Sequence, residues 1–241
     1  MRFYSITETG RVRTKNQDYL FTTDQVIGPL SNLFLVADGM GGHNAGEFAS
    51  ELAVQAVVEA IRNSTIQEPI PVLEEAIRLA NAKVFAEAQA DVEKKGMGTT
   101  LVAGTIQDGH LYIANVGDSR LYVATNQELR QITRDHSLVE ELVREGNLPE
   151  SEAKVHPRKN MITRAVGAED HVRTDFFDVE IRSGDFVLMC TDGLTNMISN
   201  EDIQEVLFVA SDSLEDKAKK LVNMAEENGG RDNITVVLIE M

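Results

Sequence analysis

Short apolar runs recur along the chain, each bounded by glycine, asparagine or aspartate. An uninterrupted apolar run of this length predicts a buried strand. The clearest runs lie at 33–37, 113–116, 186–191 and 234–239. Looser alternation predicts further strands at 2–9, 19–21 and 172–181. Residues 99–133 are expected to form a β meander, because turn residues such as Asp108-Gly109 separate their apolar segments.

Apolar residues spaced three and four positions apart predict amphipathic helices. These lie at 49–61, 73–84 and 138–143, and a last helix follows Ser213. Pro69 and Pro71 are expected to interrupt the chain between the first two helices. Ser213 and Asp216 form a capping box, and Gly229 is the expected stop. Helix pairs alternating with antiparallel strands predict an α+β domain built in layers.

The stretch 134–170 differs from its surroundings. It is polar, contains Pro149 and Pro157, and has one short helical pattern. A segment this long between strands is usually a functional flap or insertion. It is too short for an independent domain, so we expect a single domain over residues 1–241 with a flap at about 134–170.

Composition narrows the function classes. The chain has 241 residues, 42% of them hydrophobic, which is typical of a folded globular protein. Its net charge of −16 argues against binding to nucleic acid or to anionic membranes, since both need basic patches. The single cysteine, Cys190, indicates a reducing compartment. With no signal peptide and no apolar run of about 18 residues, a soluble cytoplasmic protein is expected.

Aspartates stand at the ends of the predicted buried strands. Asp38, Asp118 and Asp192 follow such runs, and Asp232 precedes the last one. If the strand ends converge, the carboxylates would repel unless a cation sat among them. Oxygen-only ligands suit Mg²⁺ or Mn²⁺ rather than zinc. The alternative is a set of independent turn aspartates, but the repetition favours a divalent metal site.

The motifs together identify a family. They are, in order, Arg13 with Asn16-Gln17-Asp18, then Asp38-Gly39-Met40-Gly41-Gly42-His43, Gly98-Thr99-Thr100, Gly117-Asp118-Ser119-Arg120, Asp192-Gly193 and Asp232-Asn233-Ile234-Thr235. In order and spacing they resemble the compact bacterial members of the PPM (protein phosphatase 2C) family of metal-dependent phosphatases. The resemblance covers essentially the whole chain.

The resemblance implies a four-layer α-β-β-α sandwich of two antiparallel sheets flanked by helix pairs. It also implies two Mn²⁺ or Mg²⁺ ions at the sheet edges, and a third, weaker ion as in bacterial relatives. The implied metal-site residues are Asp18 (through water), Asp38 (bridging both ions), Gly39 (through its carbonyl), Asp192, Asp232, and Asp118 for the third ion. Arg13 would hold the substrate phosphate.

The implied reaction is hydrolysis of phosphoserine and phosphothreonine in proteins. A water that bridges two metal ions loses its proton readily, and the hydroxide attacks phosphorus directly without a phosphoenzyme. The leaving alkoxide needs a proton, and His43 is the nearest candidate acid, although it could instead cap or orient the following helix. Cys190 has no basic loop after it, which disfavours a cysteine nucleophile.

The resemblance places the protein in a bacterial setting, as a monomer opposing a serine/threonine kinase. Its partners would be phosphoproteins, including that cognate kinase, and neither nucleic acid nor a membrane. Two alternatives remain at this point. A non-catalytic phosphoprotein-binding regulator of the same fold predicts a missing metal ligand, yet every matching position is filled. A two-metal nuclease would use similar carboxylates, but the acidic balance opposes it.

Overall fold

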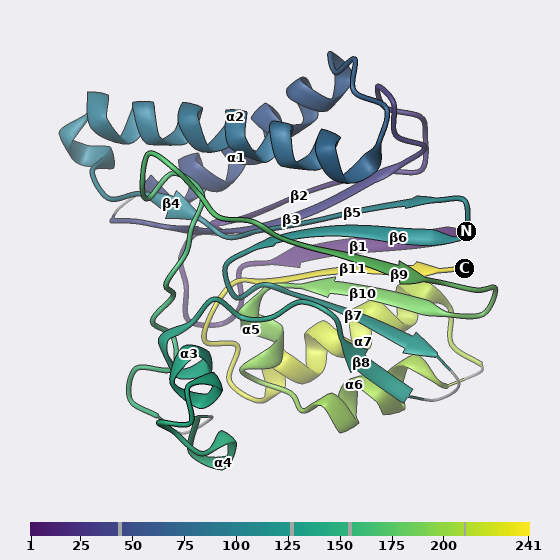
Figure 1. Ribbon diagram of the computed structural model, residues 1–241. Coiled ribbons are helices and arrows are strands. Elements are labelled where there is room, and N and C mark those ends of the chain that lie inside the picture. The colour runs from purple at the N-terminus through teal and green to yellow at the C-terminus, as the bar shows by residue number, and fades with distance from the viewer. Residues whose placement is uncertain (43–44, 126–127, 154–155, 210) are drawn as a thin grey trace.

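Residues 1–241 are described by a computed structural model, except 43–44, 126–127, 154–155 and 210. Within that described part, two antiparallel sheets lie face to face, with helices on both outer faces (Figure 1). The four-layer sandwich expected from the sequence is therefore confirmed.

The first sheet contains both the first and the last strand of the chain. Its order is β1 (Arg2–Glu8), β11 (Ile234–Glu240), β10 (Phe186–Cys190), β7 (Arg120–Thr125) and β8 (Glu128–Gln131). The second sheet has the order β2 (Asp18–Thr23), β3 (Leu33–Met40), β5 (Leu101–Gln107), β6 (His110–Val116) and β9 (Asp175–Glu180). The short β4 (Gly98–Thr99) pairs with the end of β3. Edge strands β8 and β9 thus lie on the same side of the sandwich (Figure 1).

The hydrophobic core has three layers, because the strands are buried on both faces. Between the sheets, side chains such as Val36, Ile113 and Val237 pack together. The outer face of the second sheet is covered by α1 (Ala45–Arg62) and α2 (Pro69–Ala90), and the short 3-10 helix Val92–Lys94 follows α2. The outer face of the first sheet is covered by α5 (Asp192–Thr195), α6 (Asn200–Leu207) and α7 (Leu214–Glu227).

Two sequence expectations need correction. Residues 98–131 do form strands, but not one meander: β5 and β6 pair as a hairpin, whereas β7 belongs to the other sheet. The chain crosses between the sheets at Gly117-Asp118. Pro69 and Pro71 do not interrupt the helical layer but lie in the first turn of α2, where a missing N–H costs little.

The segment 134–170 carries α3 (Leu138–Arg144) and α4 (Glu150–Ala153), which lie beside one end of the sandwich (Figure 1). Ser137 caps α3 by accepting from the N–H of Glu140. Backbone bridges tie the segment to itself and to the second sheet, between Ser137 and Ile162 and between Thr99 and Val166. Its base is therefore anchored next to the ends of β3 and β6.

Among the described helices, none combines the length and the apolar character needed to cross a membrane. Cys190 is buried in β10 and packs in the core beneath the helices of the first sheet. Burial raises the pKa of its thiol to about 12. A thiolate nucleophile at this position is therefore disfavoured.

Candidate metal centre

Strand pairing brings the first two predicted aspartates together. In the antiparallel pair β2–β3, Asp18 stands directly opposite Asp38. Directly opposed residues on neighbouring strands have side chains on the same face, about 5 Å apart at Cβ. Two carboxylates separated by 20 positions in the chain thus become neighbours at one edge of the second sheet.

Asp18 is buried, with only 6% of its surface exposed. Its Oδ2 accepts hydrogen bonds from the hydroxyls of Thr191 (2.9 Å) and Thr235 (2.7 Å), which come from the first sheet. Its Oδ1 is buried and has no hydrogen-bond partner. Burial raises the pKa of Asp18 to about 7, against the lowering effect of the two threonines. Asp18 therefore has one buried carboxylate oxygen without a hydrogen-bond partner, which a nearby cation would stabilise.

Within the described part of the chain, Asp38 is held by hydrogen bonds to its backbone. Its N–H donates to the hydroxyl of Thr100 and its carbonyl accepts from the N–H of Thr100, both at 2.8 Å. The Thr99 hydroxyl donates to the same carbonyl at 2.8 Å. These contacts give the Gly98-Thr99-Thr100 motif a physical role, since they hold the end of β3 while leaving the Asp38 carboxylate available.

The electrostatics of Asp38 show which residues meet at the site. Loss of hydration raises its pKa well above the usual value, and the next causes are the charges of Asp18, Asp192, Asp118 and Asp232. We call these five residues the aspartate cluster. Every aspartate proposed from the sequence as a metal ligand belongs to it, and the cluster draws on both sheets.

Gly39 follows Asp38 where only a residue without a side chain fits. A Cβ on Gly39 would stand 2.0 Å from the carbonyl oxygen of Gly46 and 2.7 Å from that of Gln17. The N–H of Gly39 donates to this Gln17 carbonyl at 3.0 Å. Close packing of α1 on the end of β3 thus requires glycine here.

Asp192 is the first residue of α5, and only Thr191 separates it from the buried strand β10. Its Oδ2 accepts from the side-chain amide of Asn196 at 2.8 Å, whereas its Oδ1 is buried without a partner. Burial, and after it the charge of Asp232, raises the pKa of Asp192 to about 6. Asp118, in the crossing after β6, has its pKa raised to about 7, first by burial and then by the charge of Asp192.

Asp232 and Arg13 lie together at the more exposed rim of the cluster. The Arg13 Nη2 donates to Asp232 Oδ2 at 2.8 Å, and the N–H of Asn233 donates to Asp232 Oδ1 at 2.9 Å. The Arg13 side chain is 48% exposed, and its other guanidinium nitrogens bond none of the described residues. The predicted phosphate-binding residue is therefore beside the carboxylates, with donors to spare.

Asn233 has a positioning role that the sequence did not reveal. Its amide nitrogen donates to the carbonyls of Thr9 (2.9 Å) and Lys15 (2.8 Å), and its Oδ1 accepts from the N–H of Gln17 (2.8 Å). One side chain thus ties the loop between β1 and β2, which carries Arg13, to the start of β11. In the sequence, the only indication of this role was that Asn233 directly follows the predicted ligand Asp232.

His136 fixes the crossing that carries Asp118. The ring Nδ1 of His136 accepts from the backbone N–H of Gly117 at 3.1 Å, and the backbone N–H of His136 donates to the Gly117 carbonyl at 3.0 Å. Because Nδ1 accepts, a neutral ring carries its proton on Nε2, which lies 3.2 Å from Asp175 Oδ2 and 3.1 Å from Arg164 Nη1. Burial lowers the pKa of His136 and favours this neutral form. The candidate acid His43 lies outside the described residues.

The residues fit a divalent cation by their donor chemistry. Buried carboxylates of raised pKa, two of them with an unpaired oxygen, are stabilised by a nearby positive charge, and oxygen donors suit Mg²⁺ and Mn²⁺. Across the described residues, no three Asp, Glu, His or Cys side chains are placed as a ready ligand set. Each oxygen of Asp232 already accepts one hydrogen bond, from Arg13 or from the N–H of Asn233, and keeps a further acceptor site.

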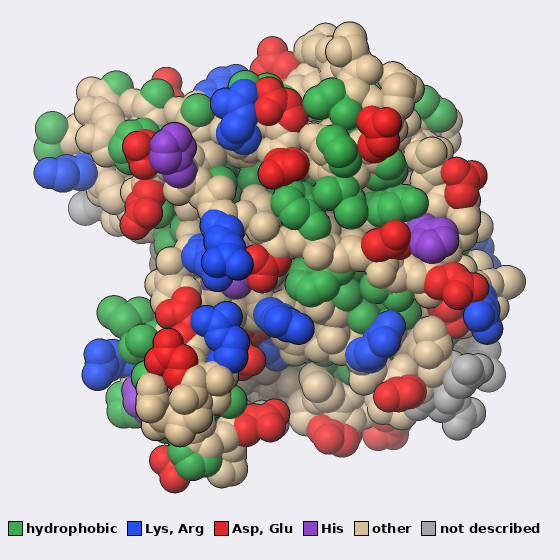
Figure 2. Space-filling model, viewed as in Figure 1, with side chains coloured by type: hydrophobic (Ala, Val, Ile, Leu, Met, Phe, Trp, Pro, Cys, Tyr) green, Lys and Arg blue, Asp and Glu red, His purple; other side chains and the backbone are tan. Residues whose placement is uncertain are grey.

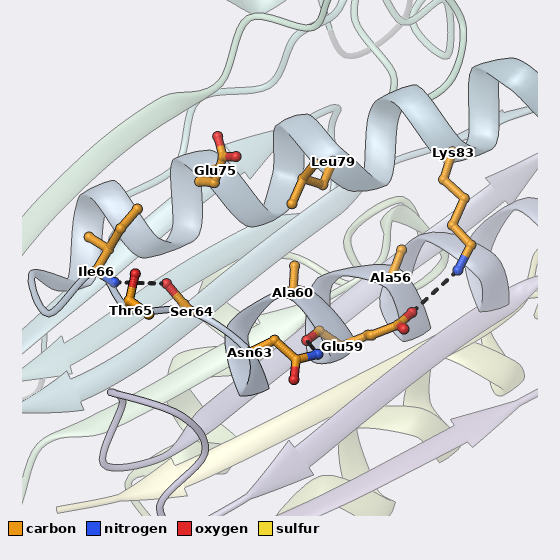
Figure 3. Close-up of a pocket in the computed structure, with 10 residues that line it drawn as sticks. All are labelled: Ala56, Glu59, Ala60, Asn63, Ser64, Thr65, Ile66, Glu75, Leu79 and Lys83. Carbon is orange, nitrogen blue, oxygen red and sulfur yellow. Dashed lines mark hydrogen bonds and ion pairs between the residues drawn. The ribbon is translucent and has the colours of Figure 1, made fainter.

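The aspartate cluster lines neither of two open pockets on the described surface. One cavity, of about 550 Å³, lies between α1 and α2 on the outer helical layer (Figure 3). There Lys83 of α2 reaches Glu59 of α1 at 3.4 Å. The other, of about 570 Å³, lies between β8 and β9. The candidate metal centre is instead a group of carboxylates at the sheet edges.

Comparisons with known proteins agree with this geometry. A family model described as protein phosphatase 2C matches residues 8–238. The serine/threonine phosphatase stp of Listeria monocytogenes is 41% identical over 240 residues, 97% of this chain and 93% of the relative. The solved S. agalactiae serine/threonine phosphatase has a TM-score of 0.91 at 38% identity, covering 98% of each chain. The PstP catalytic domain, solved with two manganese ions, has a TM-score of 0.87 at 33% identity, covering 99% of this chain and 97% of that one.

The two-sheet fold and the aspartate cluster define a metal-dependent phosphatase. The chain belongs to the protein phosphatase 2C family, because the family model and relatives above 30% identity span nearly all of it. The resemblance first drawn from the sequence motifs is thereby confirmed.

Proposed function

We propose that this chain is a metal-dependent protein serine/threonine phosphatase whose reaction centre is the aspartate cluster. The observation that carries the proposal is the convergence of five carboxylates from both sheets; burial and neighbouring carboxylates raise the pKa values of Asp18, Asp38, Asp118 and Asp192. The names of the relatives support the substrate class, since each is called a serine/threonine or protein phosphatase. The binding-regulator and nuclease alternatives receive no such support.

We propose Asp38, the Gly39 carbonyl, Asp192 and Asp232 as ligands of two Mn²⁺ or Mg²⁺ ions. Asp18 would act through water, and Asp118 with Asp192 would hold a third ion. When bound, such ions lower the pKa of water, and so provide a nucleophile at neutral pH, and offset charge on the phosphoryl group. The PstP structure with two manganese ions supports this assignment.

The chain's own groups would then orient and restrain the substrate. Arg13 would hold phosphate oxygens through the guanidinium nitrogens that bond no described residue, a geometry in which arginine can grip two oxygens at once. Thr191 and Thr235 keep Asp18 oriented, and Asn233 keeps the Arg13 loop in place. His43 remains the candidate donor of a proton to the leaving serine or threonine.

The remaining expectations are part of the same proposal. The chain would act as one domain, with residues 134–170 as a flap beside the cluster that influences substrate choice. It would work in the cytoplasm as a monomer, on phosphoserine and phosphothreonine proteins that include a cognate serine/threonine kinase.

The test is turnover of a phosphothreonine peptide with Mn²⁺ or Mg²⁺ and with chelator. We expect metal-dependent release of phosphate, abolished in Asp38→Ala and in Asp192→Ala. The exposed Asp24→Ala, outside both the flap and the cluster, is the matched control and should keep wild-type rates. Circular dichroism checks that each variant is folded. Wild-type rates in both cluster variants, or hydrolysis of DNA in place of the peptide, would refute the proposal.

A further inference from the structure

Two buried hydroxyls, those of Thr100 and Ser119, meet beside the aspartate cluster. We call them the hydroxyl pair. Their oxygens lie 2.7 Å apart, and the two residues are 2% and 0% exposed. Figure 2 shows Lys and Arg side chains interspersed with Asp and Glu on the face of the molecule in view in Figure 1. The hydroxyl pair lies beneath the surface, inside the fold.

One end of the hydroxyl pair holds Asp38. Thr100 Oγ1 accepts from the backbone N–H of Asp38 at 2.8 Å, and the same oxygen bonds Ser119 Oγ. A hydroxyl has one donor and two acceptor positions, so Thr100 can make both contacts at once. The N–H of Thr100 donates in turn to the Asp38 carbonyl at 2.8 Å. The backbone of the proposed bridging ligand is thus linked, through one oxygen atom, to Ser119.

The other end of the hydroxyl pair holds Asp118. Ser119 directly follows Asp118 and precedes β7 of the first sheet, whereas Thr100 precedes β5 of the second. On the other side of Asp118, His136 bonds both the N–H and the carbonyl of Gly117. Asp118 therefore lies between two anchored residues, and Ser119 provides the anchor that reaches across to the end of β3.

The crossing between the sheets also packs tightly on the Thr100 side chain. Leu101 pairs with Val116 in the hairpin β5–β6, so Thr100 comes opposite Gly117. A Cβ on Gly117 would stand 2.6 Å from Thr100 Cγ2, and the Gly117 φ of +103° favours glycine. Thr100 thus contacts the crossing through its methyl group and bonds it through its hydroxyl. Valine keeps the shape without the hydroxyl, and serine keeps the hydroxyl without the methyl.

We propose that Thr100 and Ser119 are positioning residues that couple Asp38 in one sheet to Asp118 at the start of the other. They act through the backbone of the proposed ligands and are not ligands themselves. Removing either hydroxyl leaves every carboxylate in the chain, yet it should weaken the binding of Mn²⁺ and slow turnover. The inference rests on the proposed function and deepens it, because it assigns two residues that make the metal centre one unit.

The first measurement is Mn²⁺ binding to the metal-free protein by isothermal titration calorimetry. In Thr100→Val, Mn²⁺ affinity should fall about tenfold or more, as is usual when a residue that orients metal ligands is lost. Ser119→Ala should lower it several-fold, because the Asp38 N–H keeps its partner. Thr100→Ser should recover most of the affinity. With p-nitrophenyl phosphate, kcat should fall in the same order while KM stays unchanged.

The matched control is Thr105→Val, in the same strand β5. The Thr105 hydroxyl is equally buried and donates to the carbonyl of Asn32 at 2.8 Å, outside the aspartate cluster. Urea unfolding should show a similar loss of stability in Thr105→Val and Thr100→Val, but only the latter should lose Mn²⁺ affinity and kcat. Equal losses of Mn²⁺ affinity in the two variants, or no recovery in Thr100→Ser, would overturn the proposal. Ser119→Ala, the milder change, keeps the test decisive if Thr100→Val does not fold.

The double variant Thr100→Val/Ser119→Ala tests the coupling itself. Once Thr100 has lost its hydroxyl, Ser119 has no partner in the pair, so Mn²⁺ affinity should fall no further than in Thr100→Val alone. Additive losses in the double variant would contradict the coupling. Wild-type Mn²⁺ affinity and kcat in both single variants would refute this inference alone. A wild-type protein that neither binds Mn²⁺ nor releases phosphate would refute the proposed function, and the inference with it.

Discussion

Replacing Asp18 by asparagine should stabilise the metal-free protein while impairing its response to metal. The asparagine Oδ1 can accept the hydroxyls of Thr191 and Thr235, which now donate to one oxygen of Asp18. The substitution therefore keeps the hydrogen bonds and removes one buried negative charge from the aspartate cluster. Asp18→Asn isolates the electrostatic cost of assembling the site.

The size of the effect follows from the raised pKa. Burial moves the pKa of Asp18 from 3.8 to about 7, so the folded chain keeps a proton that the unfolded chain has released. Stability of the wild type therefore falls as pH rises from about 4 to about 7, and the full cost applies above that window. At about 1.4 kcal/mol for each pH unit, this amounts to about 4 kcal/mol, or a Tm difference of about 10 °C.

The assay is thermal unfolding in chelator at pH 8 and at pH 4, repeated with Mn²⁺. Asp18→Asn should exceed wild type at pH 8 and match it at pH 4. Added Mn²⁺ should raise the Tm of wild type more than that of the variant, because bound ligand stabilises the folded state. The exposed Asp24→Asn should behave as wild type throughout. A variant less stable than wild type at pH 8, or a difference independent of pH, would show that the reasoning is wrong.

Three further substitutions test two supports of the site and one helix cap of the fold. Gly193→Ala should destabilise the fold and abolish turnover, since its Cβ would stand 1.9 Å from the Asn233 carbonyl oxygen; urea unfolding and peptide turnover measure both effects. His136→Ala should cost about 1–3 kcal/mol in urea unfolding by leaving the buried Gly117 N–H unpaired, and His136→Asn should recover part of this through its amide oxygen. Ser213→Ala should cost about 1 kcal/mol by removing the α7 cap, with peptide turnover unchanged.

The elements of the fold could largely be predicted because their patterns are local. The buried runs became β3, β6, β10 and β11, and the capping box of Ser213 and Asp216 marks the start of α7 as expected. Helix α6 was missed although Ser199 and Asp202 form an equivalent box.

The assignment of strands to sheets could not be predicted in the same way. A turn at Gly117-Asp118 is compatible both with a hairpin within one sheet and with a connection that crosses to the other sheet. Only the packing of Leu121 and Val123 into the core between the sheets distinguishes the two.

The charged residues of the site could be predicted from the sequence, but the residues that hold its backbone in place could not. Repeated aspartates at strand ends identify the cluster, because like charges in such positions require compensation. Asn233 and His136 act by holding backbone groups of distant segments, and no spacing along the sequence reports such contacts. The role of Arg13 and the metal-ligand assignments remain predictions.

Strand β11 comes last in chain order and yet lies in the interior of its sheet, between β1 and β10. During synthesis, the first strand must wait without a neighbour in its own layer until more than two hundred later residues have left the ribosome. Thr235, which orients Asp18, and Asp232 arrive with this final segment. The aspartate cluster of a nascent chain therefore stays incomplete until this segment has been synthesised and has paired with β1 and β10.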